Sequence, residues 1–77
     1  MHIRVLFFGK LADISGNDLL ELKNISSTGK LKAYLHGQYP GMEQIPYQMA
    51  VNKIIEKNEV IFSDGDEVAL LPPFAGG

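Results

Sequence analysis

The last two residues of the sequence, Gly76 and Gly77, are the residues whose type and position most clearly suggest chemistry. Glycine has no Cβ, so two glycines in succession can enter a channel too narrow for any side chain. The α-carboxylate of Gly77 is expected to be ionised at neutral pH, because such groups have a reference pKa of about 3.3–3.7. A carboxylate resists nucleophiles, so it becomes an acyl donor only after activation, for which condensation with ATP is the usual route. The pair predicts a terminus that another protein activates and uses.

The residues before the glycines suggest how this terminus is presented. Pro72 and Pro73 each fix φ near −65°, so we expect the tail 72–77 to leave the domain in a stiff, extended conformation. Phe74 and Ala75 follow the prolines, and we expect them to thread into a partner together with the glycines. The alternative is a frayed chain end that happens to contain glycines.

The dipeptide Gly29-Lys30 lies at the middle of a pattern typical of phosphate-binding loops. That pattern needs a glycine five positions earlier and a Ser or Thr directly after the lysine. Asn24 and Leu31 occupy these two positions, so the loop cannot wrap a phosphate and offers no hydroxyl to magnesium. We therefore predict the start of a helix here and no nucleotide site.

Other candidate ligand and catalytic residues are equally unsupported. The run 64–67 holds three carboxylates without the ligand spacing of a calcium loop, and it predicts a turn with Gly65 at positive φ. His2 and His36 lie far apart without metal-ligand spacing, and there is no cysteine. We expect the domain itself to bind no metal and no cofactor, and not to be catalytic alone.

Composition limits the class of protein. Its 77 residues allow one domain, and 45% hydrophobic with 21% charged residues is typical of a globular fold. A net charge of −2 with interspersed signs argues against nucleic acid or a membrane surface as the main partner. The apolar run near the N-terminus is too short for a signal peptide or a membrane span. Without cysteines to form disulfides, the chain is expected to be cytoplasmic.

Periodicity and turn residues predict the elements that must position the tail. Strands are expected at 3–9, 19–23, 47–52, 53–55 and 67–71, a helical turn at 10–14, and one main helix capped by Ser26, Ser27 or Thr28 and ended by Pro40. This order predicts an α+β fold, a mixed sheet of four or five strands with one main helix on one face. We expect a domain at 1–71 and an extended tail at 72–77.

Alternation along the first and last strands separates two faces of the sheet. One set carries no charge and is expected to face the helix: Ile3, Val5, Phe7, Val68 and Leu70. Facing them, the helix is expected to present Leu31, Tyr34, Leu35 and Tyr39.

The opposite face is expected to be open, yet it is half apolar. Its apolar members are Leu6, Phe8, Ala69 and Leu71, joined by Ile55. A contiguous exposed apolar patch typically marks a partner interface. The alternative is that loops cover these residues or that each is exposed singly, which is common.

Three stretches of the chain resemble the MoaD family, the small subunits of molybdopterin synthase within the ubiquitin-like β-grasp superfamily. They are "VLFFGKLADISG" at 5–16, "AVN" at 50–52 and "SDGDEVALLPPFAGG" at 63–77. The last is the most specific, since the family typically carries Asp-Gly-Asp-Glu-Val, then hydrophobic residues, then Pro-Pro-x-x-Gly-Gly. The resemblance implies a ubiquitin-like β-grasp fold and a sulfur carrier.

The resemblance also implies a reaction sequence. A MoeB-like adenylating enzyme would activate Gly77 with ATP, and a sulfur donor would convert it to a thiocarboxylate. A MoaE-like large subunit would then use that sulfur to build the dithiolene on cyclic pyranopterin monophosphate. Gly76 matches the thin penultimate position, and Phe8, Ile55 and Leu71 match positions that contact partners in the family.

Three other functions are compatible with parts of the pattern. A ThiS-type carrier for thiazole synthesis shares the fold and the terminal glycines, but Pro72-Pro73 favours the MoaD type. A ubiquitin-like protein modifier would use Gly77 to modify lysines and would share the chemistry up to the adenylate. A plain interaction module with an inert tail would not need Gly76 and Gly77 at all.

Overall fold

The computed structural model describes residues 1–72, so the prediction for residues 73–77 lies outside the described residues. Its elements in chain order are β1 (His2–Phe7), α1 (Lys10–Ser15), β2 (Leu19–Lys23), α2 (Thr28–Gln38), the 3₁₀ helix η1 (Met42–Gln44), β3 (Gln48–Val51), β4 (Ile54–Glu56) and β5 (Asp66–Leu71). The predicted order of strands and the predicted main helix are confirmed. The division into a domain at 1–71 and a tail at 72–77 stays a prediction.

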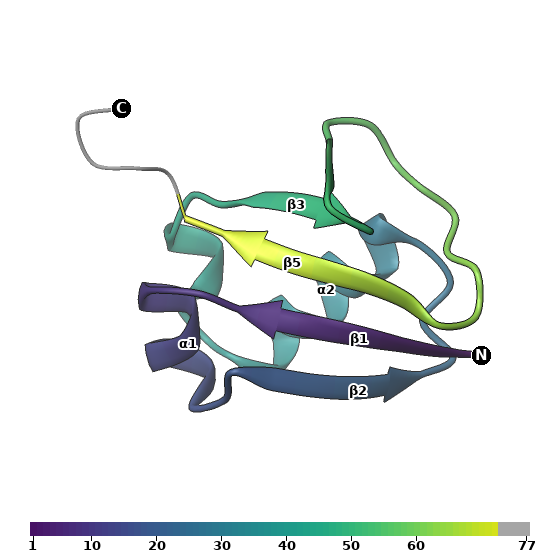
Figure 1. Ribbon diagram of the computed structural model, residues 1–77. Coiled ribbons are helices and arrows are strands. Elements are labelled where there is room, and N and C mark those ends of the chain that lie inside the picture. The colour runs from purple at the N-terminus through teal and green to yellow at the C-terminus, as the bar shows by residue number, and fades with distance from the viewer. Residues whose placement is uncertain (73–77) are drawn as a thin grey trace.

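The five strands form one mixed sheet in the order β2-β1-β5-β3-β4. β1 and β5 are parallel neighbours, while β1–β2, β3–β5 and β3–β4 are antiparallel pairs. The helix α2 lies across one face of the sheet. The short helix α1 follows β1 at the end of the sheet where β1 and β5 both terminate (Figure 1). This is the predicted α+β architecture, and it brings the end of β1 close to the root of the tail.

The core lies between the sheet and α2, as the alternation of residues along the first and last strands predicts. The five strand residues predicted to face the helix are each at most 2% exposed. From α2, Leu31 and Leu35 are fully buried against them. Tyr39 closes the end of the core, with its ring packed edge-on against Phe7 at a centroid distance of 6.1 Å. The assignment of the two sheet faces is confirmed.

One helix residue was predicted wrongly. Tyr34 was expected on the buried face of α2, but it is 37% exposed. Leu31 and Leu35 lie about 40° apart around the helix axis, and Tyr34 lies about 80° from their midpoint. Because a single helix presents only a narrow stripe to the sheet, Tyr34 falls at the margin of that stripe and remains accessible to solvent.

The start of α2 confirms a helix where the phosphate-loop pattern was rejected. Ser27 is the N-cap, and its Oγ accepts a hydrogen bond of 3.2 Å from the Lys30 N–H. A Cβ on Gly29 would lie 3.1 Å from Oε2 of Glu59, so the glycine leaves room for that carboxylate beside the first turn. A negative group near a helix N-terminus is favourable, because the first N–H groups carry partial positive charge.

The acidic run 64–67 begins with the predicted turn, and its last two residues start β5. Gly65 has φ of 86°, and its N–H donates a hydrogen bond of 2.7 Å to the His2 carbonyl oxygen. The Asp66 carboxylate accepts from the Ser63 N–H at 2.8 Å and from Nδ2 of Asn52 at 3.0 Å. These two hydrogen bonds, the Ser63 N–H first, lower the pKa of Asp66 below its usual value. The carboxylate therefore stabilises the turn locally.

Candidate functional site

The predicted site has two parts, the tail and the open face of the sheet, and the structure describes the second. Phe74, Ala75, Gly76 and Gly77 lie outside the described residues. The open face is the face opposite α2, and the strand register shows which of its side chains are neighbours. Residues directly opposite one another on paired strands point to the same face, so the register can be followed across the sheet.

A single row of apolar residues crosses the open face on all five strands. Leu19 lies opposite Leu6, Leu6 opposite Ala69, Ala69 opposite Ala50 and Ala50 opposite Ile55. We call these five residues the apolar row. Its two ends are the most accessible, with Ile55 50% and Leu19 40% exposed, whereas Ala50 is buried. The predicted patch residues Leu6, Ala69 and Ile55 are thus brought together.

The other two predicted patch residues lie beside this row, on the side where β5 ends. Leu71 is opposite Gln48, and continuing the register of Phe7 and Leu70 places Phe8 next to Leu71. Phe8 is 46% exposed and Leu71 is half-buried. All five predicted interface residues therefore belong to one apolar surface, and that surface extends to the last described residues of β5.

The opposite side of the apolar row is charged. Arg4 lies opposite Glu21 on β2 and opposite Glu67 on β5. Nη1 of Arg4 is 3.9 Å from Oε2 of Glu67, a solvent-exposed ion pair that contributes little to stability. The open face therefore carries Phe8 and Leu71 beside the exposed Gln48 toward the end of β5, and charged residues toward its start.

Two members of the apolar row, Leu19 and Ala50, were not among the predicted interface residues. The signal for Leu19 was present, since alternation in the 19–23 strand separates Leu19, Glu21 and Lys23 from the intervening leucines. What the sequence alone does not give is the register that aligns Leu19 with Leu6. Without the pairing of β1 and β2, the row could not be extended to the edge of the sheet.

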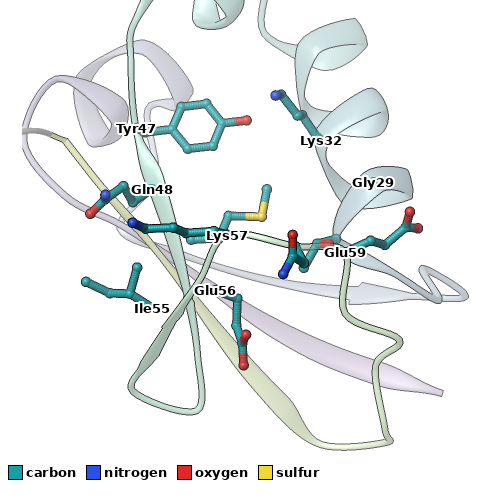
Figure 2. Close-up of a pocket in the computed structure, with 11 residues that line it drawn as sticks. Gly29, Lys32, Tyr47, Gln48, Ile55, Glu56, Lys57 and Glu59 are labelled. Atoms are coloured by element: carbon teal, nitrogen blue, oxygen red, sulfur yellow. The ribbon is translucent and has the colours of Figure 1, made fainter.

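A shallow pocket of about 450 Å³ lies between the first turns of α2 and the β3–β4 edge (Figure 2). Lys32, Lys57, Glu56 and Glu59 are among its lining residues, so its charges balance. Tyr47 also lines the pocket. Its phenolic oxygen lies 2.9 Å from Nε2 of His36, and burial raises the pKa of this tyrosine.

One hydroxyl of the pocket lining is held by the backbone. The hydroxyl of Thr28, which also lines the pocket, accepts a hydrogen bond of 3.0 Å from the Val60 N–H and serves the fold. The residues that line the pocket include no histidine and no cysteine. Within residues 1–72, no group of three or more acidic or histidine side chains is placed to hold a metal ion. Nor does any helix in that range have the length and apolar character needed to cross a membrane.

Comparison with known proteins gives full-length matches. The model of the ThiS family matches residues 5–77. The chain is 35% identical to a protein of Mycobacterium tuberculosis named molybdopterin synthase sulfur carrier subunit, over 100% of this chain and 99% of the relative. It is 30% identical to a Chlamydomonas reinhardtii protein of the same name, over the whole of both chains.

Solved structures show the same fold. A putative molybdopterin converting factor subunit 1 from Pyrococcus furiosus has a TM-score of 0.86 at 17% identity, over 96% of this chain and 99% of that one. Small archaeal modifier protein 1 from Haloferax volcanii has a TM-score of 0.83 at 21% identity, over 100% of both. Subunit 1 in a complex with subunit 2 of the Helicobacter pylori molybdopterin-converting factor has a TM-score of 0.76 at 26% identity, also over 100% of both. The predicted ubiquitin-like β-grasp fold is confirmed.

Proposed function

The chain belongs to the ThiS family, and we propose that it is the sulfur carrier subunit of a molybdopterin synthase. The observation that carries this proposal is the match, along the full length of both chains, to relatives with that name. The sequence of the tail supports it, because Pro-Pro-x-x-Gly-Gly at 72–77 ends in the group that such chemistry needs. The arrangement of the open face, with Phe8 and Leu71 toward the end of β5 and charged residues toward its start, also supports it.

We propose that Gly77 carries the sulfur. Its carboxylate oxygen would attack the α-phosphorus of ATP on a MoeB-like enzyme, forming an acyl-adenylate and releasing pyrophosphate. A sulfur donor would then attack the acyl carbon and displace AMP, leaving a thiocarboxylate on Gly77. The large subunit would take one sulfur from each of two loaded carriers, because the dithiolene that it builds on cyclic pyranopterin monophosphate holds two sulfurs, and each Gly77 would return to a carboxylate. The folded domain has no part in bond breaking in this scheme; it presents the tail to each partner.

The open face is the surface we propose for the large subunit. A partner that receives the tail must cover the side of the sheet from which the chain leaves, and that side carries Phe8 and Leu71 beside the apolar row. Phe8 and Ile55 still expose about half of their surface, so their burial on binding would be favourable. A complex of subunits 1 and 2 has been solved for the Helicobacter pylori factor, which is a precedent for such docking in a relative.

Reconstitution with different acceptors tests the proposal. Carrier loaded with sulfur would be given either a molybdopterin synthase large subunit with its pterin substrate or a thiazole synthase with its substrates. The proposal predicts dithiolene formation with the large subunit and none when Gly76 and Gly77 are deleted. Sulfur transfer only to the thiazole synthase would replace it with the thiazole pathway, and lysine-linked adducts in a cell extract would favour a protein modifier.

A further inference from the structure

The turn that joins β1 to α1 has a backbone conformation that favours glycine. Gly9 has φ of 57° and ψ of −132°, and the Leu11 N–H donates a hydrogen bond of 3.1 Å to the Phe8 carbonyl oxygen. These angles match the first central residue of a type II′ turn, a position that glycine dominates. The turn would account for a glycine here even if nothing lay beside it.

A second observation gives Gly9 a contact outside its own turn. A Cβ built on Gly9 would lie 3.1 Å from Cγ of Pro72, which is a few tenths of an ångström too close. Gly9 and Pro72 are close because β1 and β5 are paired in parallel. Phe7 lies opposite Leu70, so the chain that follows each residue leaves from the same end of the sheet (Figure 1). The ring of Pro72 therefore occupies part of the space that a side chain on Gly9 would need.

We propose that Gly9 is a positioning residue for the tail. Because Gly9 has no side chain, the Pro72 ring can lie beside it, and the position of that ring sets the direction in which the chain leaves β5. This inference rests on the proposed function of the tail. Moving the ring by about 0.4 Å turns it by roughly 10° about its Cα, and five further residues span at most about 17 Å, so the displacement at the far end is at most about 3 Å. A misplacement of about 1 Å can slow a reaction about 100-fold, although a partner that grips the tail will recover part of that loss.

The test compares Gly9→Ala with Gly16→Ala. Gly16 has φ of 71° at the other end of the same short helix, and a Cβ there would meet nothing within 4 Å. Both substitutions place alanine at positive φ, but the strain is greater at Gly9, because its ψ of −132° lies outside the left-handed helical region that Gly16 occupies. Only Gly9→Ala also crowds Pro72, and the double variant below separates the two effects. At saturating large subunit, we expect Gly9→Ala to slow sulfur transfer about tenfold or more. Its Kd for the large subunit should stay within about twofold of wild type, and Gly16→Ala should transfer at the wild-type rate.

A double variant separates the contact from the turn. Pro72→Ala removes the ring atom that a Cβ on residue 9 would meet, so it should slow transfer by itself because the contact is lost. Residues in contact show non-additive effects, so Gly9→Ala combined with Pro72→Ala should be no slower than the slower single variant. Independent effects that multiply would overturn the proposal, as would a wild-type rate in Gly9→Ala or equal slowing by Gly16→Ala.

A measurement that does not depend on sulfur keeps the inference separate from the proposed function. In the free wild-type protein, NMR should show a nuclear Overhauser effect between a Gly9 Hα and the Pro72 ring protons. The amide shifts of residues 74–77 should change in Gly9→Ala and stay unchanged in Gly16→Ala. If the wild-type chain takes up no sulfur, the proposed function fails while this comparison still tests the positioning role. The absence of the contact, or equal shifts in both variants, would refute that role.

Discussion

Ile54 and Ile55 are adjacent isoleucines on β4 that point to opposite faces, and they allow a sharp test of the proposed docking surface. Ile55 ends the apolar row on the open face and is 50% exposed. Ile54 lies opposite the buried Val51, so its side chain points to the α2 side, and it is 63% exposed. Truncating each to alanine removes the same atoms from the same strand. Only Ile55→Ala should weaken binding to the large subunit.

The size of the effect follows from the exposed surface. Burying a whole isoleucine side chain contributes about 1.5–3 kcal/mol, so burying the remaining half contributes about 0.75–1.5 kcal/mol. That corresponds to roughly a threefold to twelvefold rise in Kd. Both residues are largely exposed on a short edge strand, so each variant should lose less than about 1 kcal/mol of folding stability.

Isothermal titration calorimetry with the large subunit measures both Kd values directly, and urea unfolding of the free variants gives the matched stabilities. An Ile55→Ala variant that binds as tightly as wild type would show that the apolar row is not the docking surface. Equal weakening by Ile54→Ala would show that the effect comes from β4 as a whole and not from the open face.

Three further predictions test the tail, the start of α2 and the turn before β5. Gly77→Ala should unfold in urea as wild type does, yet it should be adenylated or transfer sulfur at a strongly reduced rate. Ser27→Ala removes the α2 N-cap and should lower the free energy of unfolding by about 1 kcal/mol, with transfer at saturating partner unchanged. The lowered pKa of Asp66 means that its stabilisation is present above the pKa of the unfolded state and is lost as pH falls through the folded one. Asp66→Asn should therefore be less stable at pH 7 and should lose less stability than wild type on acidification, as followed by thermal unfolding across pH.

The features that depend on local pattern could be predicted from the sequence. Alternation in the first and last strands was enough to identify Val5 and Val68 as core residues, because a strand buried on one side repeats every two residues. The turn at Gly65 and a cap near Ser27 followed from residue types that stabilise those conformations. These are properties of a few neighbouring residues, and no tertiary contact was needed to infer them.

The features that depend on register and on packing angle could not be predicted. Tyr34 has helical spacing that fits the core, but the width of the stripe that α2 buries depends on how the helix crosses the sheet. Leu19 joined the apolar row only once the β1–β2 register was known. The contact between Gly9 and Pro72 spans most of the chain and follows from the parallel pairing of β1 with β5. No short motif carries that information.

The central claim, that Gly77 carries sulfur, is tested most directly by the intact mass of the protein. The chain would be incubated with ATP, an adenylating enzyme and a sulfur donor, then analysed whole and after proteolysis. The account predicts a gain of about 16 Da that maps to the C-terminal peptide, as expected when one carboxylate oxygen is replaced by sulfur. An unchanged mass under conditions that load an established carrier would contradict the account.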